Sequence, residues 1–577
     1  MSAANAGEER WEFWIDRGGT FTDVVARRPD GAILTGKWLS ENPERYPDAA
    51  LYGIRQFLGL AADAPMPTER IAAVKMGTTV ATNALLERKG DRTLLVVTKG
   101  FRDSLRIGYQ TRPKLFALRI ELPDMLYERV VEVDERVTAQ GDVLVPLDLE
   151  GARKGLEQAY AEGLRSCAIL FMHAYRFPAH EAAVAGLARE IGFTQVSTSH
   201  GVSPLMKLVS RGDTTVVDAY VSPLLRRYVD RAAAELGRAR LLFMQSNGGL
   251  ADARFFQGKD SILSGPAGGV VGVVGTARQA GFEKIIGFDM GGTSTDVSHF
   301  DGEFERAFET QVAGVRMRAP MLLIHTVAAG GGSILHFDGA RYRVGPDSAG
   351  ANPGPACYRR GGPLTVTDCN LMLGKLQADF FPRVFGPGAD EPLDAEAVRG
   401  RFNELAARIR KETGDARAPE QVATGFLAIA VENMANAIKR MSVARGYDVT
   451  QYVLACFGGA GGQHACLVAD ALGMNRVLLH PLAGVLSAYG IGLADLRVIK
   501  EKTVEAPLGD AQLPAIGAEL DALAALAKAD LLAQGVPAAR ITVHKRLHLR
   551  YGGSDTPLIV DFGPRPAGAF EHRERVF

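Results

Sequence analysis

The sequence predicts a two-lobed α/β protein in which each lobe carries a glycine-rich β-hairpin. A nine-residue phrase occurs twice, as D-R-G-G-T-F-T-D-V at residues 16–24 and as D-M-G-G-T-S-T-D-V at residues 289–297, with seven of the nine positions identical. Strand-like residues stand on both sides of each copy, whereas P-loops and Rossmann fingerprints run from a strand into a helix. The repeat indicates two similar lobes, whose hairpin tips we expect to face one shared ligand.

Length and composition are those of a globular protein with roughly two to four domains. The formal net charge is zero and the basic residues are scattered, so electrostatics gives no reason to expect nucleic acid or an anionic membrane as partner. The N-terminus lacks the apolar region of a secretory signal, and the apolar stretch at 267–277 is too short to span a bilayer. We therefore expect a cytoplasmic protein.

Five cysteines without a C-x-x-C pair argue against a disulfide framework and a structural zinc site. Buried, reduced thiols are expected, including Cys357, which has no histidine near it in the sequence to activate it as a nucleophile. His544 and His548 do not suggest a metal site, because four residues along a strand span about 13 Å.

The elements of the first lobe alternate between strands and helices. Strands are expected at 12–15 and 21–26 around the first glycine turn, and a turn at 29–31 leads to a strand at 32–39. Further strands are expected at 93–98, 166–172 and 243–247, and helices at 151–163 and 267–281.

The second lobe repeats the strand–turn–strand plan at 284–300. A Gly/Pro-rich loop at 345–363 is too long for a simple connection, which makes it a candidate binding loop. Beyond it we expect a helix at 425–445, a strand and glycine turn at 452–462, a helix at 510–534 and a strand at 541–551. The helix start at 570–577 suggests a terminal unit that is not finished.

These patterns divide the chain into three parts. Residues 1–282 form an N-terminal lobe with the first hairpin and a small-residue helix, and residues 283–505 form a second lobe with the second hairpin and the long loop. Residues 506–577 form an incomplete C-terminal α/β segment.

The residues of the repeated phrase suit an anionic ligand. Paired glycines (Gly18 and Gly19, Gly291 and Gly292) let backbone N–H groups approach an anion, because no Cβ is in the way. Hydroxyl donors for phosphate oxygens are expected from Thr20, Thr22, Thr293 and Thr295. Asp16 and Asp289 would bind Mg²⁺ or its water shell, since this ion prefers one or two carboxylates together with phosphate and water. One copy alone could be a plain tight turn; two facing copies would clamp a phosphate chain.

The two phrases resemble the phosphate-1 and phosphate-2 motifs of the actin, sugar kinase and Hsp70 ATPase superfamily. The turn F-G-G-A-G-G-Q-H at 457–464 resembles its adenosine motif, which implies nucleotide contacts from Gly458, Gly459, Gly461 and Gly462. Residues 265–275 and 484–495 resemble its two connecting helices.

Within that superfamily, essentially the whole chain resembles the hydantoinase A / 5-oxoprolinase family. The resemblance is carried by K-M-G-T-T-V-A-T-N-A-L-L-E-R-K-G at 75–90, H-T-V-A-A-G-G-G-S-I at 325–334 and G-P-D-S-A-G-A-N-P-G-P-A-C-Y at 345–358. Arg17, S-E-N-P-E-R-Y-P-D-A at 40–49 and L-T-V-T-D at 364–368 are more similar to the ATP-hydrolysing 5-oxoprolinases, so Arg17 joins the expected nucleotide-binding residues.

The resemblance implies an ATP-dependent cyclic amide hydrolase. ATP and Mg²⁺ would be used to phosphorylate the lactam oxygen of 5-oxo-L-proline, and two waters would complete conversion to L-glutamate, ADP and phosphate, with Asp16 and Asp289 as catalytic residues. Family 5-oxoprolinases also carry a hydantoinase B-like half, which this chain lacks. We therefore expect a fragment, or a subunit of a homo- or hetero-oligomer that needs such a partner for efficient turnover.

Other candidate residues have equally plausible structural roles. His325, Asp347 and Arg359 could contact the substrate, although His325 could equally be a buried, hydrogen-bonded histidine beside a turn. Thr78, Thr79, Thr82 and Asn83 could face the cleft or cap a helix, and Arg106 and Arg112 could bind an acid or lie in solvent.

Two other functions remain open. One is the nucleotide-binding subunit of an ATP-dependent hydantoinase or ketone carboxylase. The other, of a different class, is a non-catalytic nucleotide switch. The long loop at 345–363 argues against the switch, because it is hard to explain without a small-molecule site.

Overall fold

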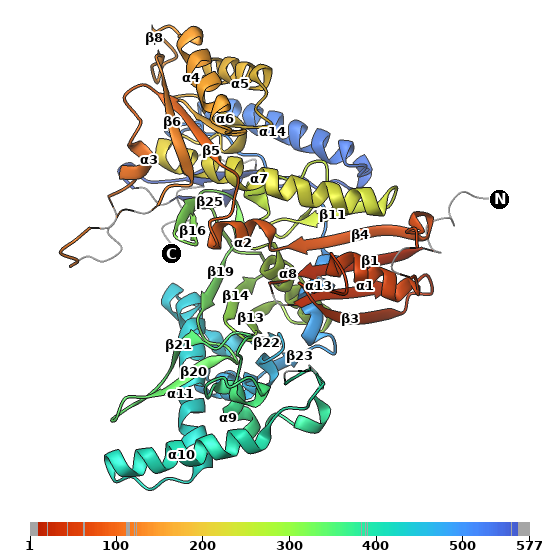
Figure 1. Ribbon diagram of the computed structural model, residues 1–577. Coiled ribbons are helices and arrows are strands. Elements are labelled where there is room, and N and C mark those ends of the chain that lie inside the picture. The colour runs from red at the N-terminus through yellow and green to blue at the C-terminus, as the bar shows by residue number, and fades with distance from the viewer. Residues whose placement is uncertain are drawn as a thin grey trace.

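The computed structural model describes residues 10–563 except residues 20, 43, 62–63, 111–115, 121, 123, 382, 387, 389 and 555–556 (Figure 1). Three predictions lie outside this part of the chain: the hydroxyl of Thr20, the position of Arg112 and the helix start at 570–577. Among the described helices, none combines the length and the apolar character needed to cross a membrane.

Two central sheets share one plan, which confirms the predicted two-lobed fold. The first has the order β12-β11-β4-β1-β2-β3 and the second the order β23-β22-β13-β14-β19. In the first sheet, β1, β2 and β3 are antiparallel neighbours, and β4 and β11 run parallel to β1 on its other side. In the second sheet, β13, β14 and β19 are antiparallel neighbours, and β22 and β23 run parallel to β13 on its other side. The first sheet comprises β1 (Trp11–Arg17), β2 (Phe21–Arg27), β3 (Ile33–Leu39), β4 (Ile71–Thr78), β11 (Arg240–Met244) and β12 (Leu250–Asp252). The second comprises β13 (Lys284–Met290), β14 (Thr295–Asp301), β19 (Ile324–Val327), β22 (Val453–Phe457) and β23 (Val477–Leu479).

Side-chain alternation along β1 decides which residues reach the site. Phe13 and Ile15 point into a core with the helices α1 (Ala49–Leu58) and α7 (Leu208–Leu236). Trp14 points to the opposite face and packs against α13 (Leu486–Leu493), and Asp16 shares that face because side chains alternate along a strand. Each hairpin therefore has one face in an apolar core and one face toward the other lobe.

The two predicted small-residue helices, α8 (Ser264–Gln279) and α13, cross at glycines between the sheets, near the centre of Figure 1. A Cβ added to Gly490 would lie 2.0 Å from the carbonyl oxygen of Gly268 and 2.4 Å from the backbone nitrogen of Gly272. The contact is therefore between backbones, and glycine is required for it.

A hairpin of the second lobe reaches across to the first. Its strands are β16 (Thr310–Val312) and β17 (Val315–Met317), and the side chains of Val312 and Met317 join a core with Leu85 and Val217 of the first lobe. Arg316 Nε also donates to Asp213 Oδ2 at 2.8 Å. We call residues 310–317 the bridging hairpin.

Each lobe carries an outer unit. The first has a parallel sheet, β10-β9-β5-β6, covered by helices, with the bounds β5 (Thr93–Thr98), β6 (Tyr127–Val133), β9 (Ser166–Leu170), β10 (Gln195–Thr198), α4 (Leu149–Ala161) and α5 (Ala179–Ile191). The second has the helices α9 (Val366–Met372), α10 (Ala395–Thr413) and α11 (Pro419–Met441) with the hairpin β20 (Ser333–Phe337) and β21 (Tyr342–Ser348). The strand at 93–98 and the helices at 151–163 and 425–445 are confirmed within a few residues, except that α11 begins earlier, with Pro419 in its first turn.

Two sequence predictions need correction. The loop predicted at 345–363 begins inside β21, which continues to Ser348 through an irregular register that accommodates Pro346, a residue without an N–H to donate. The strand predicted at 541–551 is limited to β24 (Arg546–Leu549), which pairs with β25 (Leu558–Asp561). Between these elements and α13 lies α14 (Leu513–Ala533), close to the predicted helix at 510–534.

Candidate functional site

The first hairpin places a carboxylate against two glycines. Asp16 stands opposite Asp23 on β2 and beside Gly77 on β4. A Cβ added to Gly77 would lie 3.2 Å from Asp16 Oδ1, and one added to Gly265 would lie 2.8 Å from the same atom. Glycine at both positions leaves room for this buried oxygen, which has no hydrogen-bond partner in the described part of the chain.

The tip of the first hairpin is held by two hydroxyl groups. Gly18 N donates to the carbonyl oxygen of Phe21 at 3.0 Å, and Ser40 Oγ donates to the carbonyl oxygen of Gly18 at 2.7 Å. The fully buried Thr22 shares a hydrogen bond of 3.0 Å with Ser40. Ser40, the first residue of one of the resembling phrases, therefore stabilises this tip.

The structure corrects the predicted role of two threonines. Thr22 and Thr295 occupy equivalent positions in the repeat, and both are fully buried. Thr295 donates to the carbonyl oxygen of Ala329, as Thr22 bonds to Ser40. Each is adjacent to an aspartate on its strand, so alternation turns its side chain to the opposite face. Both threonines therefore stabilise the hairpins from inside the protein. Thr293, by contrast, is exposed at the tip of the second hairpin, as expected for a hydroxyl that contacts a ligand.

The second hairpin repeats the carboxylate arrangement. Asp289 stands opposite Asp296 on β14, whose Oδ1 accepts a 2.6 Å hydrogen bond from Thr326 Oγ1 on β19. Gly458 follows β22 with a φ of 84°, and a Cβ there would lie 2.3 Å from Asp289 Oδ1. The predicted adenosine turn therefore starts in contact with the carboxylate of the second hairpin.

The remaining glycine turn and the long loop stack on the second hairpin tip. Gly331 N donates to the carbonyl oxygen of Gly291 at 3.1 Å, and Gly332 N donates to that of Gly292 at 2.6 Å. Ala349 N in turn donates to the carbonyl oxygen of Gly332 at 2.9 Å. Backbone hydrogen bonds thus connect three segments that are far apart in the sequence: the second hairpin tip, the glycine turn at 330–332 and the long loop.

The adenosine turn is anchored on the same strand. Ala460 N donates to the carbonyl oxygen of Met290 at 2.9 Å, while Gly459 and Gly462 face open space or only the end of a leucine side chain. His464 behind the turn is fully buried, and burial lowers its pKa to about 4, so the ring is neutral at physiological pH. Asn370 Nδ2 lies 3.1 Å from Nε2 of His464.

The carboxylates of the two hairpins share one electrostatic environment. Burial, reinforced by Asp23, raises the pKa of Asp16 to about 7. Burial, then Asp296 and then Asp16, raises the pKa of Asp289 to about 8. Because Asp16 acts on Asp289, charges from the two lobes lie close enough to interact, as expected for facing hairpins.

This donor set fits a magnesium ion that keeps most of its water. The Oδ1 atom of Asp16 is a hard oxygen ligand without a hydrogen-bond partner in the described part of the chain, so it needs a positive partner. Among the described residues, no group of three or more His, Cys, Asp or Glu side chains forms a complete cage for a metal. Partial coordination of this kind suits Mg²⁺ bound together with phosphate oxygens.

Arg17 and His325 lie away from the carboxylates. Arg17 follows Asp16 on β1 and points to the other face, where its guanidinium stacks on the ring of Tyr228 at 5.0 Å. His325 stands opposite Val297, a core residue of the face that packs on α11, and the Arg440 charge on α11 adds to burial in lowering its pKa. Neither side chain reaches the space between the hairpins.

Asp347 and Arg359 differ in their surroundings. The Asp347 side chain is 74% exposed, with Oδ2 at 3.8 Å from His336 Nε2. Arg359 donates to the carbonyl oxygen of Pro392 at 2.7 Å and to Asp394 at 3.0 Å, so its guanidinium is occupied by a structural contact. Of these two candidates, Asp347 is the one whose side chain is largely exposed to a ligand.

Several residues of the site were not predicted. Asp23 and Asp296 are the eighth residues of the repeated phrase, and the hairpin register alone would have placed them opposite Asp16 and Asp289. Lys37, which pairs with Asp23, gave no signal in the sequence, because its position depends on the register of β3.

A buried carboxylate clamps the long loop. Asp368 accepts hydrogen bonds from the backbone N–H groups of Ala356, Cys357 and Thr365 at 3.1, 2.9 and 2.8 Å. The predicted inert character of Cys357 agrees with its full burial, which raises the pKa of its thiol.

We expect Asp368→Ala to free residues 356–365 from this clamp, since three buried donors lose their acceptor. Hydrogen exchange of the amides of Ala356 and Cys357 should accelerate about tenfold or more. Asp338→Ala is the matched control, because this exposed aspartate also accepts from two backbone amides, those of Ala340 and Arg341. Unchanged exchange in Asp368→Ala would contradict the clamp.

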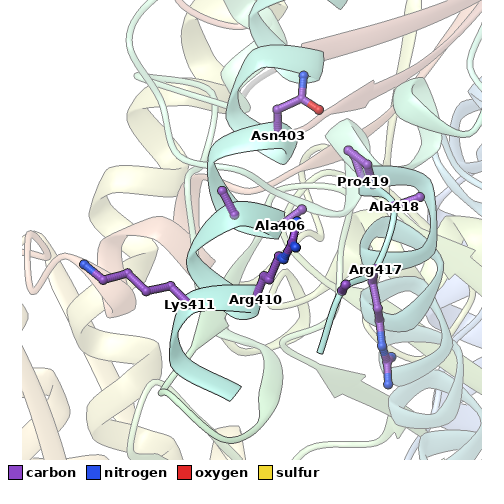
Figure 2. A pocket seen from close by; sticks show the side chains of 9 residues that line it. Asn403, Ala406, Arg410, Lys411, Arg417, Ala418 and Pro419 are labelled. Carbon is purple, nitrogen blue, oxygen red and sulfur yellow. The ribbon is translucent and has the colours of Figure 1, made fainter. Parts of the chain in front are cut away.

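A separate shallow pocket of about 670 Å³ lies between α10 and the start of α11 (Figure 2). Figure 2 shows the basic side chains of Arg410, Lys411 and Arg417 at its rim. Arg417 is already engaged with Asp415 at 2.6 Å. The described residues that line this pocket include no carboxylate and no glycine, unlike those around Asp16 and Asp289.

Comparison with known proteins places both lobes in one family. The family model described as hydantoinase/oxoprolinase matches residues 211–500, and that described as its N-terminal region matches residues 12–192. The chain is 45% identical to 5-oxoprolinase 1 of Arabidopsis thaliana over 96% of its own length and 47% of that protein. It is 33% identical to caprolactamase subunit alpha of Pseudomonas jessenii over 87% of its length and 73% of that protein.

The chain spans about half the length of the 5-oxoprolinases that it matches, including that of Saccharomyces cerevisiae, of which it covers 46%. Among solved structures, the ATP-dependent caprolactamase from Pseudomonas jessenii has a TM-score of 0.84 at 30% identity, covering 98% of this chain and 83% of that one. A nucleotide-free acetone carboxylase structure has a TM-score of 0.72 at 24% identity, again over 98% and 83%, which shows a shared fold.

Proposed function

This chain belongs to the hydantoinase/oxoprolinase family, and on that premise we propose that it binds ATP and phosphorylates a cyclic amide, above all 5-oxo-L-proline. One observation carries the proposal: three glycine turns, led by Gly18, Gly291 and Gly458, gather around the carboxylates of Asp16 and Asp289. Similarity to several 5-oxoprolinases at more than 40% identity supports the substrate.

The chemistry follows from the low reactivity of an unstrained amide. The γ-phosphoryl group passes to the lactam oxygen, so the bond from phosphorus to ADP breaks as the new bond to oxygen forms. Water then adds to the activated ring carbon and the C–N bond opens. A second water releases phosphate, which gives L-glutamate and accounts for both waters.

Phosphoryl transfer needs positioning and charge neutralisation more than covalent help from the protein. The exposed tips at Gly19 and Gly292 offer backbone N–H groups to phosphate oxygens, and Thr293 adds a hydroxyl. Asp16 and Asp289 would hold Mg²⁺ directly or through water. When bound, the ion neutralises the charge on the phosphates.

The later steps belong, in this proposal, to a hydantoinase B-like half. Support comes from the length of the matched 5-oxoprolinases, which extend well beyond the region similar to this chain. It also comes from the caprolactamase relative, which is named as a subunit. On this basis the chain alone carries out lactam activation, and the partner completes ring opening.

The test is ADP release by the purified chain, with and without 5-oxoproline, and with and without a hydantoinase B-type protein. Stimulation of ADP release by 5-oxoproline is the expected result, whether or not glutamate forms. Caprolactam, a hydantoin, and a ketone with bicarbonate serve as parallel substrates. ATP binding without stimulation by any of them would refute the proposed activity and favour a nucleotide switch.

A larger lactam is the second candidate, favoured by the caprolactamase similarity over most of both chains. Stronger stimulation of ADP release by caprolactam than by 5-oxoproline would select it. The same phosphorylation chemistry applies, so only the fit of the ring and the carboxylate of 5-oxoproline separates the two.

A further inference from the structure

The two lobes differ at one position in a row of residues that they otherwise share. In the first lobe, Asp16, Asp23 and Lys37 are successive cross-strand partners on β1, β2 and β3. In the second lobe, the equivalent row is Asp289, Asp296 and Thr326 on β13, β14 and β19. Cross-strand partners project from the same face of a sheet. The duplicated rows therefore end in a cation in one lobe and in a hydroxyl in the other.

The position of Lys37 is supported by a second difference between the copies. Its ammonium group contacts Asp23 and lies 5.4 Å from the ring centroid of Phe21. Phe21 is one of the two positions at which the repeated phrases differ, since the second copy has Ser294 there. The first lobe thus holds both the lysine and an aromatic ring beneath its ammonium group.

The ion pair of Lys37 is open to exchange. The lysine side chain is 45% exposed, whereas that of Asp23 is 15% exposed. A half-exposed pair of this kind contributes little to stability, while an ammonium group on a phosphate forms a strong charge-assisted hydrogen bond. Thr326, by contrast, is exposed but uses its hydroxyl to donate to Asp296, an arrangement that adds no positive charge.

Charge balance points to the same residue. Two aspartates opposite each other in a sheet repel, and each lobe has such a pair. Among the described residues, Lys37 is the cation that lowers the pKa of Asp16, Asp23 and Asp289, so its charge acts on carboxylates of both hairpins. A polyanionic ligand bound between the hairpins requires a counter-charge, and Lys37 can supply it by leaving its pair with Asp23.

We propose that Lys37 binds a phosphate group of the nucleotide and contacts it from the first lobe, next to the hairpin tip at Gly18 and Gly19. This inference rests on the proposed nucleotide site. It assigns a positive charge of the protein itself to the first lobe, in addition to the metal ion that Asp16 and Asp289 would hold.

The test compares the binding of ligands with and without phosphates. Titration calorimetry of a non-hydrolysable ATP analogue with Mg²⁺, of ADP and of adenosine is carried out on the full chain and on Lys37→Met. We expect Lys37→Met to weaken binding of the ATP analogue about ten- to a hundredfold and to leave adenosine binding unchanged. Lys37→Arg should retain most of the affinity.

Lys99→Met is the matched control, because Lys99 also pairs with an aspartate, Asp134 at 2.7 Å, on an exposed part of the first lobe. It should bind every ligand as the unaltered chain does. Equal loss of adenosine and ATP analogue in Lys37→Met would overturn the proposal, since that result indicates a structural role. Full affinity in Lys37→Met would overturn it as well. Failure of the unaltered chain to bind any nucleotide would instead refute the proposed function on which it rests.

Discussion

Asp289→Asn should lower ATP turnover at least tenfold while stabilising the ligand-free protein at alkaline pH. The amide keeps the shape of the carboxyl group but removes the charge that would hold Mg²⁺ and its water. Burial and Asp296 raise the pKa of Asp289 to about 8, from an ordinary value of 3.8. The folded state therefore retains a proton that the unfolded chain releases, and the wild-type protein loses stability as the pH rises from about 4 to about 8.

Thermal midpoints at pH 6 and pH 9 measure this effect. The difference in thermal midpoint, variant minus wild type, should be larger at pH 9 than at pH 6 by on the order of 1–2 °C. Asp16→Asn should behave in the same way with a smaller shift, since the pKa of Asp16 is raised to about 7. Asp30→Asn, in an exposed turn, is the control and should change neither property. Near-normal turnover in both Asp16→Asn and Asp289→Asn would falsify the assignment of the phosphate site.

Gly490→Ala should be among the most destabilising single substitutions in the chain. The added methyl group would lie 2.0 Å from the carbonyl oxygen of Gly268, a backbone atom that cannot rotate away. The helices α8 and α13 must then separate, which disturbs the packing of Trp14 on α13. We expect a loss of about 3 kcal/mol or more, seen as a lower thermal midpoint of the nucleotide-free chain.

Gly400→Ala provides the comparison within a helix. Gly400 lies inside α10, and a Cβ there meets nothing within 4 Å. Alanine should therefore raise stability by about 0.5–1 kcal/mol, because it lowers the conformational entropy of the unfolded chain. If Gly490→Ala were as well tolerated as this control, the close crossing of α8 and α13 would be disproved.

The hairpins and their glycine turns could be predicted because their signals are local. A repeated phrase with strand-like residues on both sides favours a tight turn wherever it occurs, and the small-residue runs at 265–275 and 484–495 resemble the connecting helices of a known superfamily. Strand alternation also separates two of the threonines from the neighbouring aspartates. Thr22 precedes Asp23, so the two cannot share a face, and the same holds for Thr295 and Asp296.

The remaining features of the site depend on contacts between distant segments. Ser40 reaches the tip at Gly18 only after β3 pairs with β2, and the role of Lys37 depends on that same register. Arg359 was a reasonable candidate for binding an acid, but Asp394 lies beside it in the folded chain. Which charged groups are paired is a tertiary property, and nothing in the local sequence around Arg359 indicates it.

The bridging hairpin constrains how the lobes can move. The lobes meet where α8 crosses α13, and they meet again where Val312, Met317 and Arg316 contact the first lobe. A backbone hydrogen bond adds a further contact, since Leu322 N donates to the carbonyl oxygen of Ser246 at 2.8 Å. A twist or a sliding displacement of one lobe against the other would therefore have to break the Arg316–Asp213 ion pair together with these contacts.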